Sequence, residues 1–329
     1  MANFHPQQPE ASRKTVYHIP FTECSRFWGR EDIIARIDEA LLAESSTKSI
    51  RSFALYGMGG VGKTQIALRY ASVSREKLDA IFWISAESSV TIGQSFREIA
   101  KTLGLIKPDT ETDDNAVMLE VKQWLSSTKS RWLLIYDNAD DLSAMKYAWP
   151  AGSVGSILIT SRDSTAAFSL ASSGCQVTPF DTDSGSAALL NILGLDMDST
   201  SNQEEAKAIT STLGGLPLAL NQIGGFISQR KIPLKNFLGL YNRNSASVDA
   251  KSTTSMDYNL TLATVWEMAL SKLSGSSKTL HMTLSFLDPD YIHEALLHDG
   301  ALQVNDASLE FMADEIEYVL LQLIQTYGN

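Results

Sequence analysis

The stretch GMGGVGKT, Gly57 to Thr64, follows the apolar run RSFALY and precedes a segment with helical periodicity. It matches G-x-x-x-x-G-K-[ST] at every fixed position, which is the pattern of a phosphate-binding loop. Glycines let successive backbone amides turn inward around phosphates, and a helix opening at Lys63 adds the positive end of its dipole. A glycine-rich turn without a ligand is the weaker interpretation, because a strand precedes the loop and a helix follows it. The stretch therefore predicts a P-loop that binds a nucleotide.

A second run, WLLIYD (132–137), supplies the other half of such a site. An apolar strand that ends in Asp137 places a carboxylate beside the phosphate loop, where it can hold Mg²⁺ or its water. In the loop itself, Lys63 is expected to reach the β- and γ-phosphates, and the hydroxyl of Thr64 to coordinate Mg²⁺. The expected ligands are therefore the phosphates of a nucleotide together with Mg²⁺.

The residue after that carboxylate is an amide, Asn138. An amide cannot accept a proton as a carboxylate can, so hydrolysis is expected to be slow, and Asn138→Asp is expected to accelerate it. Asp140 and Asp141 are alternative candidates for the missing carboxylate. The favoured interpretation of both residues is that they cap the helix that follows.

From residue 51 onward, short apolar and β-branched runs alternate with amphipathic stretches of helical length. Such runs are typical of strands buried on both faces, and their alternation with helices predicts a parallel sheet covered on both sides. The predicted strands are RSFALY (51–56), AIFWIS (80–85), WLLIYD (132–137), SILITS (156–161) and CQVTPF (175–180). The expected fold class is an α/β P-loop NTPase with a mostly parallel five-stranded sheet.

After Phe180 the apolar residues follow helical spacing, and no strand candidate is found. A stretch rich in Ser, Thr and Asn then interrupts the helical pattern, which marks a loop or linker. The domains expected are a polar arm (1–26), the nucleotide-binding domain (27–180), a helical subdomain (181–243), the linker (244–257) and a further helical region (258–329).

Composition restricts the classes of partner. The 329 residues carry a net charge of −11 without any run of clustered Lys and Arg, so nucleic acid and anionic membranes are disfavoured. Cys24 and Cys175 lie far apart without metal-ligand spacing, which indicates free thiols in a reducing compartment. No signal peptide or membrane span is apparent, so a cytoplasmic location is expected.

Seven motifs occur in an order that is characteristic of one family. They are FWGRE (27–31), GMGGVGKT (57–64), FWISA (82–86), LLIYDNADD (133–141), ILITSRD (157–163), GGLPLAL (214–220) and SFLDPDYI (285–292). Together they resemble the NB-ARC domain of the STAND P-loop NTPases, which is found in plant resistance proteins, the animal apoptosome ATPase and fungal NOD-like receptors. The motifs of the fungal members are the most similar in sequence. The resemblance implies that 181–243 is an ARC1-type subdomain and 258–329 part of a winged-helix subdomain.

The resemblance also implies roles for individual residues. The nucleotide would be bound by Phe27, Trp28, Gly29, Arg30, Gly57, Gly59, Gly60, Val61, Gly62, Lys63, Thr64 and Pro217. In this set the FWGR residues and Pro217 lie against the adenine, and the loop holds the phosphates. Arg162 matches the sensor arginine, whose guanidinium could report the γ-phosphate, and it joins Asp137 and Asn138 as a catalytic-site residue.

The function implied is a nucleotide-driven switch, in which ADP closes the helical parts onto the sheet and ATP opens them for self-assembly into a homo-oligomer. Fungal innate-immune or incompatibility signalling is the expected setting, with effector and sensor partners unknown. One alternative is an ATPase with appreciable turnover. Another is a winged-helix regulator of nucleic acid, but residues 251–329 carry three lysines against eleven Asp and Glu, which opposes phosphate contacts.

The chain is expected to stop inside the winged-helix part, at LLQLIQTYGN. In the family, a histidine further on donates to the β-phosphate of ADP. The triplet at 297–299, Leu-His-Asp, comes too early to replace it. Fast exchange of ADP and self-association through the C-terminal helix are therefore expected.

Overall fold

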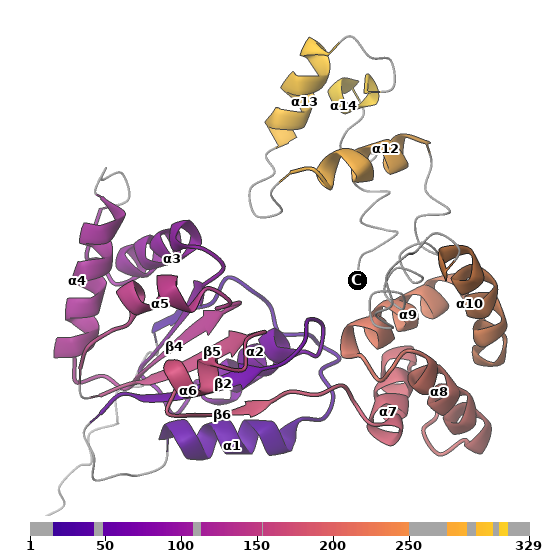
Figure 1. Ribbon diagram of the computed structural model, residues 1–329, viewed down its shortest axis with the longest axis horizontal. Coiled ribbons are helices and arrows are strands. Elements are labelled where there is room, and N and C mark those ends of the chain that lie inside the picture. The colour runs from indigo at the N-terminus through magenta and orange to yellow at the C-terminus, as the bar shows by residue number, and fades with distance from the viewer. Residues whose placement is uncertain are drawn as a thin grey trace, which may run out of the picture. The chain divides into compact units, whose positions relative to one another are not determined.

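A computed structural model describes residues 16–42, 49–107, 113–152, 154–249, 275–287, 294–304 and 309–314. The chain divides into two compact units, the first ending at Thr178 and the second beginning at Pro179. The first unit contains the sheet and its covering helices, and the described part of the second consists of helices (Figure 1). The candidate site residues of the phosphate loop and of the strand ends all lie in the first unit.

Parallel strands form a single six-stranded sheet in the order β1-β3-β4-β5-β2-β6. Their bounds are β1 Val16–His18, β2 Arg51–Tyr56, β3 Ala80–Ser85, β4 Trp132–Asp137, β5 Ser156–Ser161 and β6 Ser173–Gln176. The four strands β2 to β5 have the bounds that the sequence predicts. They are continuous apolar runs because the helices on both faces of the sheet bury them.

The structure differs from the predicted five strands at the two edges of the sheet. Val16–His18, within the predicted polar arm, pair in parallel with Ala80–Phe82 of β3 as a sixth strand. At the other edge, β6 begins at Ser173 and ends at Gln176, whereas the sequence predicts 175–180. Edge strands are short and partly exposed, so they lack the continuous apolar run that identifies central strands.

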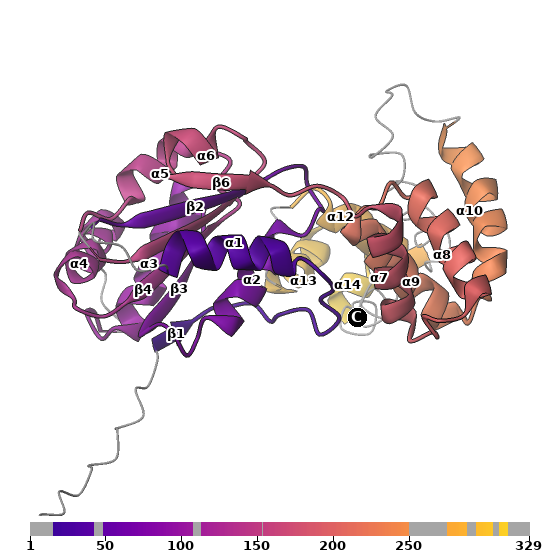
Figure 2. The same ribbon diagram turned by 90° about the horizontal axis from the view of Figure 1, so that it is seen from below.

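Among the described residues, the helices of the first unit are α1 Glu31–Leu42, α2 Lys63–Val73, α3 Ser89–Thr102, α4 Asp114–Ser127, α5 Leu142–Ala148 and α6 Ala166–Ser169. Figure 1 shows α1 on one face of the sheet and α3, α4 and α5 on the other. Trp132, Leu134 and Tyr136 alternate along β4 and pack in one buried cluster with side chains of α3 and α4. The residues between them belong to the opposite face, where α1 and α2 pack against β5 (Figure 2).

In the second unit, a helical group follows the sheet as the sequence predicts. It consists of α7 Thr182–Leu193, α8 Thr200–Thr212, α9 Pro217–Arg230 and α10 Leu234–Asp249. Helix α7 packs against α8 and α9, and α8 also packs against α10. The buried side chains include Leu189, Ile209, Ile223 and Phe237, one from each helix.

Further along the described chain come α12 Gly275–Leu284, α13 Glu294–Gln303 and α14 Phe311–Asp314. Leu280, Leu297 and Met312, one from each helix, form a small buried cluster. Within the described residues, none of the helices combines the length and the apolar character that crossing a bilayer requires.

Helix α10 continues to Asp249, across the start of the predicted linker at 244–257. Its early turns bury Phe237 and Tyr241, and these contacts anchor a helix that then runs on through Ser and Asn. Ser and Asn cost a helix less than about 0.7 kcal/mol per residue relative to Ala, so polar composition alone does not end one. The rest of the predicted linker, the end of SFLDPDYI and the C-terminal segment from 315 lie outside the described residues.

Candidate functional site

The phosphate loop connects β2 to α2 and spans Gly57 to Gly62. Gly57 has φ of +147°, and a Cβ there would lie 2.4 Å from the carbonyl oxygen of Val177. Gly62 has φ of +94° with no atom within 4 Å of an added Cβ, so it lies beside open space. The first glycine is required for close packing of the loop on the sheet, and the last for a left-handed turn into the helix.

The N-terminus of α2 has no side-chain cap. By contrast, side chains accept hydrogen bonds from the first backbone N–H groups of other helices, namely Ser88, Asp113, Asp141, Asp181 and Ser199. The first N–H groups of a helix have no acceptor within the helix. Because Gly62 precedes α2, those groups and the positive end of the helix dipole remain suited to bind an anion such as a phosphate.

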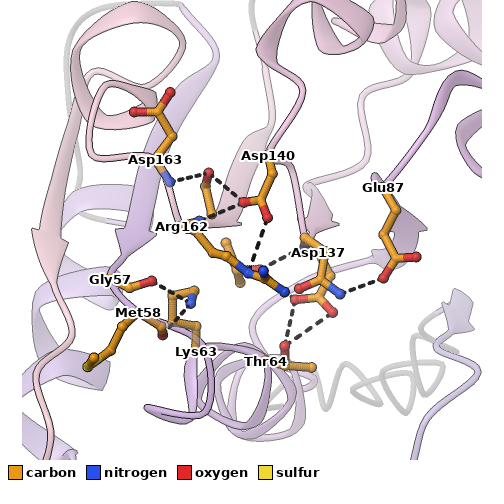
Figure 3. Close-up of polar contacts among 12 residues, drawn as sticks. Gly57, Met58, Lys63, Thr64, Glu87, Asp137, Asp140, Arg162 and Asp163 are labelled. Carbon is orange, nitrogen blue, oxygen red and sulfur yellow. Dashed lines mark hydrogen bonds and ion pairs between the residues drawn. The ribbon is translucent and has the colours of Figure 1, made fainter. Parts of the chain in front are cut away.

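Lys63, the first residue of α2, is buried over this loop, with only 8% of its surface exposed. Its Nζ donates to the carbonyl oxygens of Gly57 at 2.8 Å and Met58 at 2.9 Å (Figure 3). Burial lowers the pKa of Lys63 because it disfavours the ammonium, and the carboxylate of Asp140 opposes that effect. An ammonium held by two neutral carbonyls at a helix N-terminus is well placed to exchange them for phosphate oxygens.

Asp137, the last residue of β4, is buried beside the start of α2. The hydroxyl of Thr64 donates to its two carboxylate oxygens at 2.9 Å and 3.2 Å, and the hydroxyl of Thr160 donates to Oδ1 at 2.5 Å (Figure 3). Burial raises the pKa of Asp137, while the hydrogen bonds from Thr160 and Thr64 and the charge of Lys63 oppose the rise. A threonine hydroxyl and a carboxylate are hard oxygen donors, so this pair fits Mg²⁺.

Asn138 is in the left-handed region, with φ of +57°. Its backbone N–H donates to the hydroxyl oxygen of Thr160 at 3.0 Å, so the Thr160 hydroxyl links it to Asp137. Its side-chain amide donates to Oε1 of Glu87 at 2.8 Å (Figure 3). The sequence motifs do not include Glu87. Its position two residues beyond the predicted strand 80–85 is the available signal, because neighbouring parallel strands end at the same edge of a sheet.

Arg162 follows β5 at this edge, and its side chain is 72% exposed. Its Nε lies 3.4 Å from Oδ2 of Asp140, and its backbone N–H donates to Oδ1 of the same carboxylate at 2.6 Å. Asp141 instead caps α5, accepting from the backbone N–H groups of Ser143 and Ala144. Hydrogen bonds from Ser143 and Ala144 accordingly lower the pKa of Asp141. The two adjacent aspartates therefore have different contacts, Asp140 with Arg162 and Asp141 with the first turn of α5.

The residues predicted to contact adenine belong to two separate elements of the chain. Phe27 to Arg30 precede α1, with Gly29 and Arg30 both at positive φ, and Arg30 donates from Nη2 to the carbonyl of Thr178 at 2.7 Å. The Arg69 guanidinium lies 6.0 Å from the centre of the Phe27 ring. Pro217 is the first residue of α9 in the second unit, a position that favours proline in any helix. The contacts of Phe27 to Arg30 and Pro217 with adenine stay predictions.

Two family matches cover separate parts of the chain. Residues 30–193 match the NB-ARC domain, and residues 268–325 match a domain of unknown function, DUF7779. The first match contains the P-loop, Asp137, Asn138 and Arg162. The second match lies within the region predicted to be part of a winged-helix subdomain.

Relatives occur in fungi and plants. A nucleotide-binding leucine-rich repeat (NLR)-like protein of Hyaloscypha variabilis is 33% identical over 265 residues, covering 74% of this chain and 26% of the relative. The probable disease resistance protein RF45 of Arabidopsis thaliana is 22% identical over 306 residues, covering 87% of this chain and 29% of the relative. This chain thus spans less than a third of the length of either relative.

A solved structure shares the fold. The Signal Transduction ATPase with Numerous Domains (STAND) protein with a tetratricopeptide repeat sensor from Pyrococcus horikoshii matches 96% of this chain and 41% of its own length, with a TM-score of 0.51 and 14% identity. At that identity the likeness shows the fold alone. The match over residues 30–193 and the 33% identity to the NLR-like protein show that this segment belongs to the NB-ARC family.

Proposed function

We propose that this chain is a molecular switch that binds ADP or ATP with Mg²⁺. The observation that carries the proposal is the convergence of Lys63, Thr64 and Asp137 at the uncapped N-terminus of α2. Lys63 would exchange the carbonyls of Gly57 and Met58 for phosphate oxygens. Thr64 and Asp137 would hold Mg²⁺, which neutralises phosphate charge when bound.

The sensing of ATP against ADP is assigned to Arg162. Its guanidinium is largely exposed and pairs with Asp140 through a 3.4 Å contact, which is long for an ion pair that must hold against solvent. A γ-phosphate would compete with Asp140 for this group, because a doubly charged phosphate offers a guanidinium stronger, paired hydrogen bonds. ADP would leave the pair as it is. The two nucleotides would therefore stabilise two different positions of one arginine.

The consequence proposed for the whole protein is a switch between closed and open arrangements. ADP would favour closure of the helical subdomain onto the sheet, and exchange for ATP would permit opening and assembly into a homo-oligomer. We place this switch in fungal innate-immune or incompatibility signalling in the cytoplasm, and the disease-resistance name of a plant relative supports the immune part of this proposal. A second candidate, an ATPase with appreciable turnover, is favoured by one observation, the carboxylate of Glu87 beside Asn138.

Three measurements test the switch. The nucleotide that co-purifies with the chain is identified by chromatography after denaturation, and we expect ADP. Binding of fluorescent ADP and ATP is titrated with and without Mg²⁺, and we expect Mg²⁺ to tighten ATP binding. The mass of the protein in solution is then compared in ADP and in a non-hydrolysable ATP analogue, where only the analogue should produce larger assemblies. Failure to bind either nucleotide would overturn the proposal.

A further inference from the structure

The pair formed by Glu87 and Asn138 is positioned by the backbone of two neighbouring strands. In the parallel register of β3 and β4, Ser85 lies opposite Asp137, and the N–H of Ala86 donates to the carbonyl of Asp137 at 2.7 Å. Glu87 therefore comes one residue after the end of this ladder, at the sheet edge that also carries the Mg²⁺ carboxylate. Strand register therefore brings Glu87, in the connection between β3 and α3, to this edge of the sheet.

Hydrogen bonds among Asn138, Thr160 and Asp137 fix the backbone of Asn138 and so orient its side-chain amide. Its backbone N–H donates to the Thr160 hydroxyl, which donates in turn to Asp137. Asn tolerates the left-handed conformation that this position has, so the residue directs its side chain toward Glu87 at little backbone cost. A continuous set of hydrogen bonds thus runs from the metal-binding carboxylate through Thr160 and Asn138 to the Glu87 carboxylate.

A purely structural role for Glu87 would be to cap the following helix, but that role belongs to its neighbour. Ser88 is the N-cap of α3, and it forms a capping box with Thr91. Glu87 is exposed, and an ionised carboxylate can accept up to about four hydrogen bonds. The bond from Asn138 does not exhaust that capacity, so the group can also accept a hydrogen bond from a water molecule.

We propose that Glu87 is the general base for hydrolysis of ATP in this site and that Asn138 is its positioning residue. This inference rests on the proposed nucleotide-binding function. The oxygen of a water molecule forms a bond to the γ-phosphorus while the bond from that phosphorus to the β–γ bridging oxygen breaks. The water proton passes to Glu87, and the electron pair of the broken bond leaves on ADP. In a site where a second acid follows the strand-end Asp, that acid would be the base. Here Asn138 occupies that position, and the carboxylate comes instead from Glu87, beyond the neighbouring strand.

The test is the isosteric variant Glu87→Gln in the full chain. Gln accepts the hydrogen bond from Asn138 through its own Oε1, so the fold is retained and only the ability to take a proton is lost. General-base assistance is worth about 10²- to 10⁴-fold, so single-turnover hydrolysis of bound ATP should fall by that factor while the Kd for ATP changes less than about twofold. Glu120→Gln, on an exposed position of α4, is the matched control and should hydrolyse at the wild-type rate.

The outcomes separate this inference from the proposed function. A wild-type chain that binds ATP but does not hydrolyse it in a single turnover overturns the role of Glu87 and leaves the switch intact. That role is also overturned if Glu87→Gln hydrolyses ATP as fast as the wild type. A chain that binds no nucleotide refutes both. Loss of hydrolysis in Glu87→Gln with ATP affinity preserved supports the general base.

Discussion

The phosphate loop and the strand end at Asn138 lie at the same edge of the sheet, but different kinds of information determine them. The loop is one continuous stretch, and its conformation follows from glycines and from the helix that begins at Lys63. The Asn138–Glu87 pair joins residues 51 positions apart, and it exists only because β3 and β4 are neighbours in register. The conformation of the P-loop is therefore encoded locally, whereas the partner of Asn138 depends on tertiary contacts.

Removal of the phosphate-loop lysine is expected to cause the most severe loss of nucleotide affinity. Lys63→Ala should weaken binding of ATP and ADP by at least about 100-fold, because each charge-assisted hydrogen bond to a phosphate contributes about 1.5–3 kcal/mol. Fluorescence titration measures the change. Lys101→Ala is the control, since Lys101 is an α3 lysine paired with Glu98 outside the site. Equal affinity of wild type and Lys63→Ala would contradict the P-loop interpretation.

A second prediction concerns the geometry of the same loop. In Gly57→Ala, the new Cβ would lie 2.4 Å from the Val177 carbonyl oxygen, at a φ of +147° that L residues rarely adopt. Overpacking of this kind costs about 1–3 kcal/mol, so the free energy of unfolding should fall by at least that amount in denaturant titration. Gly225→Ala, in α9 with no atom within 4 Å of its added Cβ, should be neutral or slightly stabilising. Similar stability of the two variants would argue against the close approach.

Asn138→Asp tests the contact between Asn138 and Glu87, because the sequence and the structure predict changes of opposite sign in the hydrolysis rate. From the sequence alone, Asn138→Asp adds a base and accelerates hydrolysis. In the structure, the new carboxylate would replace the amide that donates to Glu87 at 2.8 Å, so Glu87 would lose its positioning hydrogen bond. Glu87 would also face a like charge, which raises the pKa of one of the two carboxylates. We expect about tenfold slower turnover at neutral pH, with the acidic limb of the pH–rate profile displaced to higher pH.

The control for this variant keeps the backbone and adds no charge. Asn138→Gly accommodates the φ of +57° and removes only the amide that positions Glu87. Its turnover should fall without the displacement of the pH profile. Faster ATP hydrolysis in Asn138→Asp would contradict the role of Glu87. It would indicate instead that a carboxylate at position 138 acts as the base.

The smallest expected effect on the fold comes from Asp137→Asn. Burial raises the pKa of Asp137, so between its ordinary value and its folded value the folded state binds more protons than the unfolded state. Stability therefore falls as pH rises through that window, and at neutral pH the buried charge is a cost. Asn can still accept from Thr160, so the variant should show a modestly higher Tm at pH 7 and lose the Mg²⁺ dependence of ATP binding. A lower Tm at pH 7 would contradict the assigned burial cost.

Much of the fold can be predicted because its signals are local. The strands β2 to β5 follow from continuous apolar runs, and their predicted bounds agree with the structure. The pattern misses the edge strand β1 and displaces β6, since half-exposed residues carry no such run. Helix α10 extends into a stretch whose polar composition predicts a linker, because contacts of its early turns stabilise it.

Local sequence patterns suffice to predict a P-loop, a strand ending in Asp137 and a parallel α/β sheet. These features depend on dihedral freedom and periodicity within a few consecutive residues. Only the tertiary structure decided which aspartate pairs with Arg162, which one caps α5, and which carboxylate faces Asn138. The reason is physical: parallel neighbours are joined by crossovers through whole helices, so contacts at strand ends are set by sheet order and register, which no short stretch contains.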